Sequence, residues 1–150
     1  MRQHWFRSTM FKVDPAEDEE TNPFCYGREL AQWLRGRFTE LGYAPEEVFP
    51  EDWGWCVMLS REVGLLWLGC SNISSHLYKQ VSPAQKKTFV PDGSSFVWTV
   101  IVGMDKPIWS LRLGKRRAAI ERLEQSAGKV ELELEAVLRA ESGIAIVPEP

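Results

Sequence analysis

The 150-residue sequence contains few of the residues and motifs from which catalytic and metal centres are commonly built. It has two histidines, His4 and His76, and three cysteines, Cys25, Cys56 and Cys70, with no Cys-x-x-Cys pair. An odd, widely spaced set of cysteines predicts neither a disulfide framework nor a structural zinc site. Glycine-rich phosphate loops, Gly-x-Ser-x-Gly and His-Glu-x-x-His are absent from the sequence. We therefore expect no bound metal and no cofactor.

Long apolar segments are also missing from the sequence. The longest apolar run, VGLLWLGC at 63–70, is much shorter than the roughly 20 residues of a membrane-spanning helix. Residues 1–13, MRQHWFRSTMFKV, lack the apolar core of a signal peptide. These features predict a cytoplasmic protein with no membrane partner.

Charge is distributed unevenly along a chain whose formal net charge is −3. Residues 1–75 hold seven Lys/Arg against twelve Asp/Glu, whereas residues 79–117 hold eight Lys/Arg against two Asp/Glu. The basic segment includes Lys86, Lys87 and interleaved aromatic residues, a composition shared with surfaces that stack nucleic-acid bases. No RNP, KH or helix-turn-helix pattern accompanies it. Nucleic acid is therefore disfavoured, and another protein is the expected partner.

Apolar residues recur in the first third of the chain with the periods of a strand and then of a helix. Residues 4–13 predict a strand, and the acidic stretch 14–22, which lacks the pattern of a calcium loop, is expected to be a solvated loop. Spacings of three and four predict a helix over 23–41, with Asn22 as its N-cap and Gly42 as its stop. The strand residues expected to share one face are Trp5, Phe11 and Val13. The helix residues expected to be buried are Trp33, Leu34 and Phe38.

The stretch EDWGWCVML at 51–59, followed by SREVGLLWLGCSN, predicts a hairpin in the middle of the sheet. A three-residue loop at 62–64, with Gly64 left-handed, sets a register in which Cys56 lies opposite Cys70. That register makes a reversible disulfide geometrically possible, although a reducing compartment favours buried free thiols. Both faces of the hairpin are apolar, so we expect both to be covered. The tryptophans that the register places on one face are Trp53, Trp55 and Trp67.

The second half of the chain completes the predicted fold. Its expected elements are a polar, basic loop at 72–94, a strand at 96–104, a helix at 116–140 and a short edge strand at 144–147. The segment 108–113 fits a strand or a helix, and Gly128 could divide the last helix in two. Residues 1–150 are thus expected to form a single α+β domain of order β-α-β-β-β-α, with a largely antiparallel sheet.

The segments EDWGWCVM and LWLGCSN resemble those of a group of small uncharacterised bacterial proteins. Proteins of that group carry a Trp-Gly-Trp strand before an apolar strand that ends in Gly-Cys. The resemblance covers about the first half of the chain. It implies a recurrent domain and assigns neither an activity nor functional residues.

The sequence leaves two main classes of function open, with nucleic-acid binding as a minor third. The first is a non-catalytic interaction protein, of which an inhibitor or an immunity-type protein is one form. Aromatic side chains at the rim of a groove, with a carboxylate beside them, are typical of interaction hot spots. The binding residues expected for this class are Asp52, Trp53, Lys86 and Lys87. The second class is a small enzyme whose carboxylate- and tryptophan-lined pocket includes Glu51, Asp52 and His76.

Overall fold

The computed structural model describes residues 2–107 and 113–150, which form one antiparallel sheet with helices packed against it. The strand order is β2-β3-β4-β5-β1-β6, and every neighbouring pair is antiparallel. The strands are β1 Gln3–Ser8, β2 Phe49–Glu51, β3 Gly54–Ser60, β4 Leu65–Asn72, β5 Trp98–Asp105 and β6 Ile144–Ile146. The helices are α1 Arg28–Glu40, α2 Leu77–Gln80 and α3 Leu113–Ala140, with short 3-10 turns at Glu17–Glu19, Lys86–Thr88 and Gly93–Ser95. The predicted α+β fold with an antiparallel sheet is confirmed.

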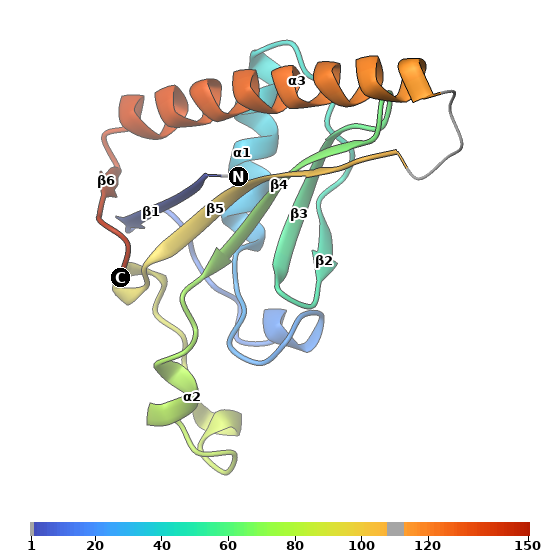
Figure 1. The fold of residues 1–150 in the computed structure, drawn as a ribbon. Coiled ribbons are helices and arrows are strands. Elements are labelled where there is room, and N and C mark those ends of the chain that lie inside the picture. The colour runs from blue at the N-terminus through green and yellow to red at the C-terminus, as the bar shows by residue number, and fades with distance from the viewer. Residues whose placement is uncertain (1, 108–112) are drawn as a thin grey trace.

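Helices α1 and α3 supply the apolar cover of the sheet. In Figure 1, α1 lies behind the strands and α3 runs across their upper ends. Buried residues of both helices join alternate strand residues in a single core, which includes Leu30, Leu34, Phe38, Leu123, Val130, Leu134, Phe6, Trp55, Val57, Leu68, Val100 and Val102. None of the helices in the described ranges combines the length and the apolarity needed to cross a lipid bilayer.

Helix α1 begins at Arg28, five residues later than the predicted start at residue 23. Phe24 and Gly27 adopt φ angles of 65° and 150°, which an α-helix does not accommodate. The N–H groups of Gly27 and Arg28 donate to Oε1 of Glu17 at 2.6 and 2.8 Å. A distant carboxylate therefore caps the helix, and the predicted N-cap role of Asn22 is wrong.

The other end of α1 follows the sequence prediction more closely. Gly42, with φ of 95°, comes directly after Leu41 and stops the helix as expected. Leu34 and Phe38 are fully buried, as predicted. Trp33 is only half-buried against Phe11, with ring centroids 5.7 Å apart, because it lies at the margin of the covered face.

Strand β1 ends at Ser8, so the predicted strand 4–13 is too long and its face assignment is wrong. Phe6 is the strand residue that points into the core, whereas Trp5 belongs to the opposite face because neighbouring strand residues alternate. Phe11 lies beyond the strand and enters the core from a loop, in edge contact with Trp98 at 5.9 Å.

The C-terminal half agrees with most of the sequence prediction. Helix α3 runs unbroken through Gly128, so the chain forms one helix there and not two. The edge strand predicted at 144–147 is β6, which pairs with β1. Of the ambiguous segment 108–113, residues 108–112 lie outside the described ranges and Leu113 begins α3. Strand β2 was not predicted, since it is only three residues long and contains a proline.

The cap that Glu17 provides gives a direct test of the fold. Glu17→Ala leaves the buried N–H of Gly27 and the partly buried N–H of Arg28 without an acceptor, which should lower the free energy of unfolding by about 1–3 kcal/mol. Glu19→Ala is the matched control, because Glu19 lies two residues away in the same turn with an exposed side chain. Urea unfolding measures both variants. Equal losses in the two variants would contradict the capping role of Glu17.

Candidate functional site

The pairing registers assign alternate strand residues to two faces of the sheet. One row crosses five strands through the hydrogen-bonded neighbours Phe49, Cys56, Gly69, Ile101 and Gln3. This row, together with the rows that lie two residues further along the strands in either direction, forms the face that points away from the core. We call it the open face. Its residues are Phe49, Cys56, Met58, Leu65, Trp67, Gly69, Ile101, Gly103, Gln3 and Trp5, together with Trp53 stacked above them.

In the described ranges, the buried side chains of α1 and α3 belong to the core cluster except Ala119, which lines a pocket with Leu65 and Asp105 at one end of the open face. Apolar residues of both α1 and α3 join the core, and Figure 1 shows α1 behind the sheet and α3 across the upper ends of the strands. The expected cover on both faces of the central hairpin is provided by helices on one face only, while on the other face Cys56 and Met58 are buried, 3% and 4% exposed, by other parts of the described chain. Over the described residues, the strands of the open face are shielded by aromatic side chains that lie against them, and not by a helix.

A β-bulge decides which tryptophan belongs to which face. Ser60 pairs with Leu66, the register predicted from the loop at 62–64, but the register shifts by one residue between Met58 and Ser60. Beyond the bulge Met58 pairs with Trp67, and a one-residue shift moves side chains to the other face. The prediction that Trp53, Trp55 and Trp67 share a face is consequently wrong.

The same shift separates the two cysteines of the hairpin. Cys56 pairs with Gly69, while Cys70 pairs with Trp55, so the two thiols lie on opposite faces and the predicted disulfide geometry does not occur. Both residues, like Cys25, are buried free thiols, as expected. Burial, with a smaller effect of the Glu51 charge, raises the pKa of Cys56 to about 12. The thiol of Cys56 is therefore protonated near neutral pH and is a weak nucleophile.

Trp53 and Trp67 form a stacked pair on the open face. Their ring centroids are 5.4 Å apart and the rings are inclined by 27°. Glycines make room for them: a Cβ atom on Gly69 would approach the Trp53 ring to 2.8 Å, and one on Gly103 would clash with the ring of Trp67. Nε1 of Trp67 donates to Oδ2 of Asp105 at 3.1 Å, which fixes the orientation of the indole.

Trp53 belongs to a tight turn that projects it over the sheet. Glu51 and Gly54 are paired as the last residues of β2 and the first of β3, so Asp52 and Trp53 form a two-residue turn. Gly54 has φ of 147°, a value that other residues rarely adopt. The backbone N–H of Asn22 donates to the carbonyl of Asp52 at 2.9 Å and ties the turn to the acidic loop. The exposed fraction of Trp53 is 41%, against 3% for Trp55.

A shallow pocket of about 180 Å³ opens beside this aromatic pair. Its lining comes from strands β2 to β5 and from the β2–β3 turn. It includes two carboxylates, Glu51 and Asp105. The lining residues are Phe49, Glu51, Trp53, Cys56, Met58, Leu65, Trp67 and Asp105, which include no lysine or arginine. The pocket is thus acidic and aromatic. In residues 2–107 and 113–150, no group of three or more His, Cys, Asp or Glu side chains is placed to hold a metal ion.

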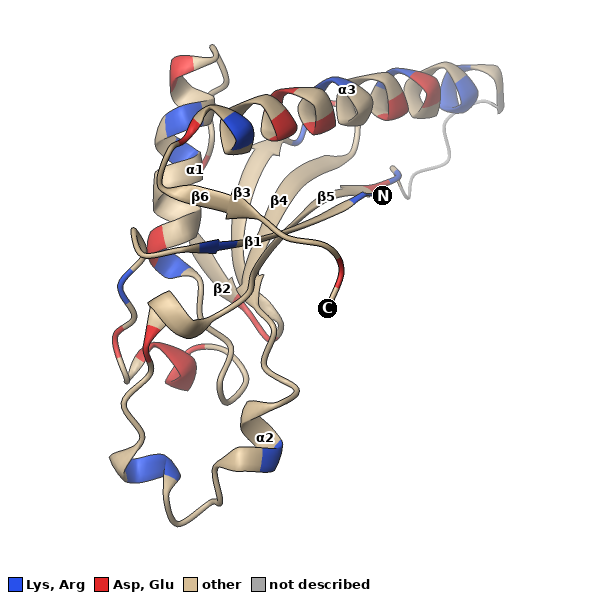
Figure 2. Ribbon diagram, turned by 90° about the vertical axis from the view of Figure 1, so that its left-hand side faces the viewer, with Lys and Arg blue, Asp and Glu red and all other residues tan. Residues whose placement is uncertain are grey.

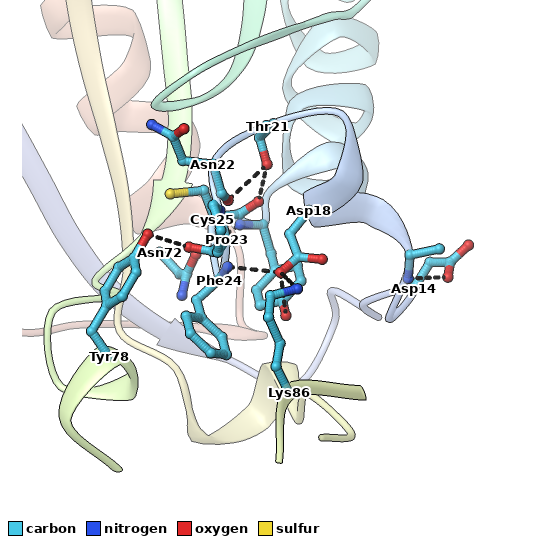
Figure 3. A network of polar contacts seen from close by, with 12 residues as sticks. Asp14, Asp18, Thr21, Asn22, Pro23, Phe24, Cys25, Asn72, Tyr78 and Lys86 are labelled. Atoms are coloured by element: carbon cyan, nitrogen blue, oxygen red, sulfur yellow. Dashed lines mark hydrogen bonds and ion pairs between the residues drawn. The ribbon is translucent and has the colours of Figure 1, made fainter. Parts of the chain in front are cut away.

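The acidic loop that supports the turn is held by a buried polar network, drawn in Figure 3. Asp18, predicted to be solvated, is buried, and its Oδ2 accepts from the N–H of Phe24 at 2.8 Å and from the hydroxyl of Tyr26 at 3.3 Å. Nζ of Lys86 approaches the same oxygen to 3.0 Å. This ion pair joins the acidic loop to the basic loop, whose lysines are the blue segments at the lower end of the molecule in Figure 2.

The structure places the sequence-predicted binding residues in two groups. Asp52 and Trp53 lie together in the β2–β3 turn. Lys86 compensates the charge of a buried carboxylate, and Lys87 is exposed beside it. Within the described ranges, no hydrogen bond or ion pair joins either lysine to Asp52. The two groups are therefore not one site.

The residues considered for an enzyme are also apart. Glu51 and Asp52 are exposed at the β2–β3 turn, and His76 is exposed at the start of α2. In the part of the chain that the structure describes, the side chain of His76 forms no hydrogen bond or ion pair with either carboxylate. In the described structure, no hydrogen bond joins these residues to one another as the acid and base of one site.

Sequence reasoning missed Asp105, Phe49 and Met58 as members of the site. The one available signal was the pair of glycines, Gly69 and Gly103, inside otherwise apolar strands. A glycine in a strand interior often marks the close approach of another group, which here is an indole ring.

The contrasting positions of Trp53 and Trp55 give a stability prediction. Trp55→Ala removes a buried core side chain and should cost about 3–5 kcal/mol of unfolding free energy. Trp53→Ala removes a side chain from the surface of the sheet and should cost clearly less. Chemical denaturation of both variants tests this difference. If Trp53→Ala unfolds as readily as Trp55→Ala, Trp53 belongs to the core and the open face does not exist as described.

The glycine beneath Trp67 gives a second prediction. Gly103→Ala should displace the Trp67 indole, lowering stability and changing the near-ultraviolet circular dichroism of the tryptophans. Gly128→Ala is the control, because nothing lies within 4 Å of its added Cβ and alanine favours a helix interior by about 1 kcal/mol. We expect the first substitution to lower the melting temperature and the second to raise it. A neutral Gly103→Ala would show that Trp67 is not seated on this glycine.

Comparison of the chain with protein-family models, curated proteins and solved structures finds no match. The resemblance of EDWGWCVM and LWLGCSN to small bacterial proteins therefore stays a prediction.

Proposed function

We propose that this chain is a non-catalytic protein-binding domain and that the open face, centred on Trp53 and Trp67, contacts the partner protein. The observation that carries the proposal is a stacked tryptophan pair, of which Trp53 is exposed and Trp67 half-buried, on a sheet face without a helical cover in the described residues. Tryptophan is enriched among the residues that dominate binding energies at protein interfaces. Apolar surface of this kind, edged by polar groups, is typical of interaction sites.

The form of the sheet favours its face over its edges as the binding surface. The edge strand β2 contains Pro50, which cannot donate to an added strand, and the other edge, β6, has only three residues. A partner strand would find few donors and acceptors at either edge. The open face, in contrast, offers a rigid surface, because its aromatic rings are seated over glycines and need little further ordering on binding.

The dispersed positions of Glu51, Asp52 and His76 also support binding over catalysis. An enzyme of the kind considered from the sequence needs its acid and base within reach of one substrate. The pocket beside Trp53 and Trp67 has carboxylates but no basic group, and its thiol has a raised pKa. These features support recognition of a partner.

Affinity capture from a lysate of the host organism tests this proposal. The wild-type chain should retain a protein, and Trp53→Ala should reduce the recovery of that protein by about tenfold or more, as hot-spot truncations do. Tyr78→Ala is the matched control: Tyr78 is a similarly exposed aromatic residue, but it belongs to α2 and not to the open face.

Recovery that is unchanged by Trp53→Ala and lost with Tyr78→Ala would contradict the proposed surface. Retention of a small metabolite without any protein would favour the enzyme class instead. The folded state of each variant is checked by circular dichroism, so that a loss of recovery reports on the surface.

A further inference from the structure

We propose that the pocket beside Trp53 and Trp67 accepts an arginine side chain of the partner protein. This inference rests on the protein-binding function proposed above and specifies the chemistry of the partner. Three features of the pocket carry it: its charge, the arrangement of its aromatic rings and its size.

The charge of the pocket favours a cationic group. Glu51 and Asp105 stand at its edge, and Asp52 follows in the adjoining turn. In residues 2–107 and 113–150, none of the three carboxylates forms an ion pair, although ten such pairs occur elsewhere in these ranges. The acidic side chains are thus available to a group from outside.

The aromatic rings favour a guanidinium over an ammonium group. A guanidinium is planar and weakly hydrated, so it stacks on an indole face while its N–H groups donate in its own plane. The chain already contains such a contact on its covered side, where Cζ of Arg28 lies 4.4 Å from the ring centroid of Trp55. A lysine ammonium is compact and strongly hydrated, and stacks less well.

The carboxylates are placed to complete this contact. Oδ2 of Asp105 already accepts from Nε1 of Trp67, which holds the carboxylate beside the indole ring. A guanidinium that stacks on the exposed ring of Trp53 lies in a pocket whose lining offers two carboxylate acceptors, Asp105 and Glu51. The carboxylates therefore provide direction, and the indoles provide a flat surface.

The size of the pocket also fits one side chain. Its volume of about 180 Å³ is smaller than the roughly 300–1,000 Å³ of sites that enclose cofactors or drug-sized ligands. A single side chain from a protein surface needs less space, because the remainder of the partner rests on the surrounding face. The pocket thus serves as the specific contact within a larger interface.

Nuclear magnetic resonance of the tryptophan indole N–H groups tests the inference with a defined probe. Titration with Nα-acetyl-arginine amide should shift the Trp53 and Trp67 signals in a saturable manner and leave the signal of Trp33, on the helix side, unchanged. Nα-acetyl-citrulline amide has nearly the same shape without the charge, and should bind about tenfold more weakly if the cation is recognised.

Two carboxylate variants separate the pocket from the general acidity of the chain. Asp105→Asn and Glu51→Gln should each weaken binding of the arginine probe by about three- to tenfold. Glu40→Gln removes the same charge from the exposed end of α1, on the other side of the sheet, and should leave the affinity unchanged.

Equal shifts with the arginine and citrulline probes would overturn the inference, as would the absence of any saturable shift at Trp53. Stronger binding of Nα-acetyl-lysine amide would overturn the choice of arginine. Each of these results leaves the capture experiment intact: a partner lost with Trp53→Ala would then bind the open face through other chemistry. Loss of the capture result, in contrast, removes the protein-binding function itself.

Discussion

Strands β3 and β4 change their register by one residue at the bulge between Met58 and Ser60, and the arrangement of the tryptophans depends on this change. On one side of the bulge, Trp55 and Val57 point toward α1 and complete the core. On the same strands, the alternate residues Met58 and Trp67 point to the open face. Because side chains alternate strictly along a strand, no residue can serve both faces. Because of the bulge, Trp55 of this hairpin lies in the core and Trp67 lies on the open face.

A second constraint links the buried acidic loop to that surface. Glu17 caps α1 and Asp18 fixes the loop at Phe24, whose φ of 65° is unusual for a residue other than glycine. Lys86 forms an ion pair with Asp18 of this loop. The N–H of Asn22, in the same loop, donates a hydrogen bond to the carbonyl of Asp52. The turn that carries Trp53 is thus fixed from two sides, by strand pairing and by this loop. A fixed turn loses little conformational entropy on binding, which suits a recognition surface.

The sequence was sufficient for the elements with strong periodicity and insufficient for features set by tertiary contacts. The core stripe of α1, its stop at Gly42, the central hairpin and the edge strand after α3 follow from spacing and turn residues. The start of α1 could not be predicted, because Glu17 caps it from ten residues away. The bulge at Met58–Ser60 depends on packing on both sides of the strand, and its omission placed Trp67 on the face of Trp55, whereas the β2–β3 turn determines the position of Trp53. Of the predicted binding residues, Asp52 and Trp53 lie at the candidate site, whereas Lys86 neutralises a carboxylate whose burial no local pattern indicated.

Within residues 2–107 and 113–150, one face of the sheet lacks a helical cover over the stacked pair Trp53 and Trp67. Hydroxyl-radical footprinting of the intact chain, read by mass spectrometry at each tryptophan, measures this most directly. The account predicts rapid oxidation of Trp53, slower but clear oxidation of Trp67, and protection of Trp55 and Trp98, which are 3% and 1% exposed. Protection of Trp53 and Trp67 equal to that of Trp98 would contradict the account, because both indoles would then lie in a core.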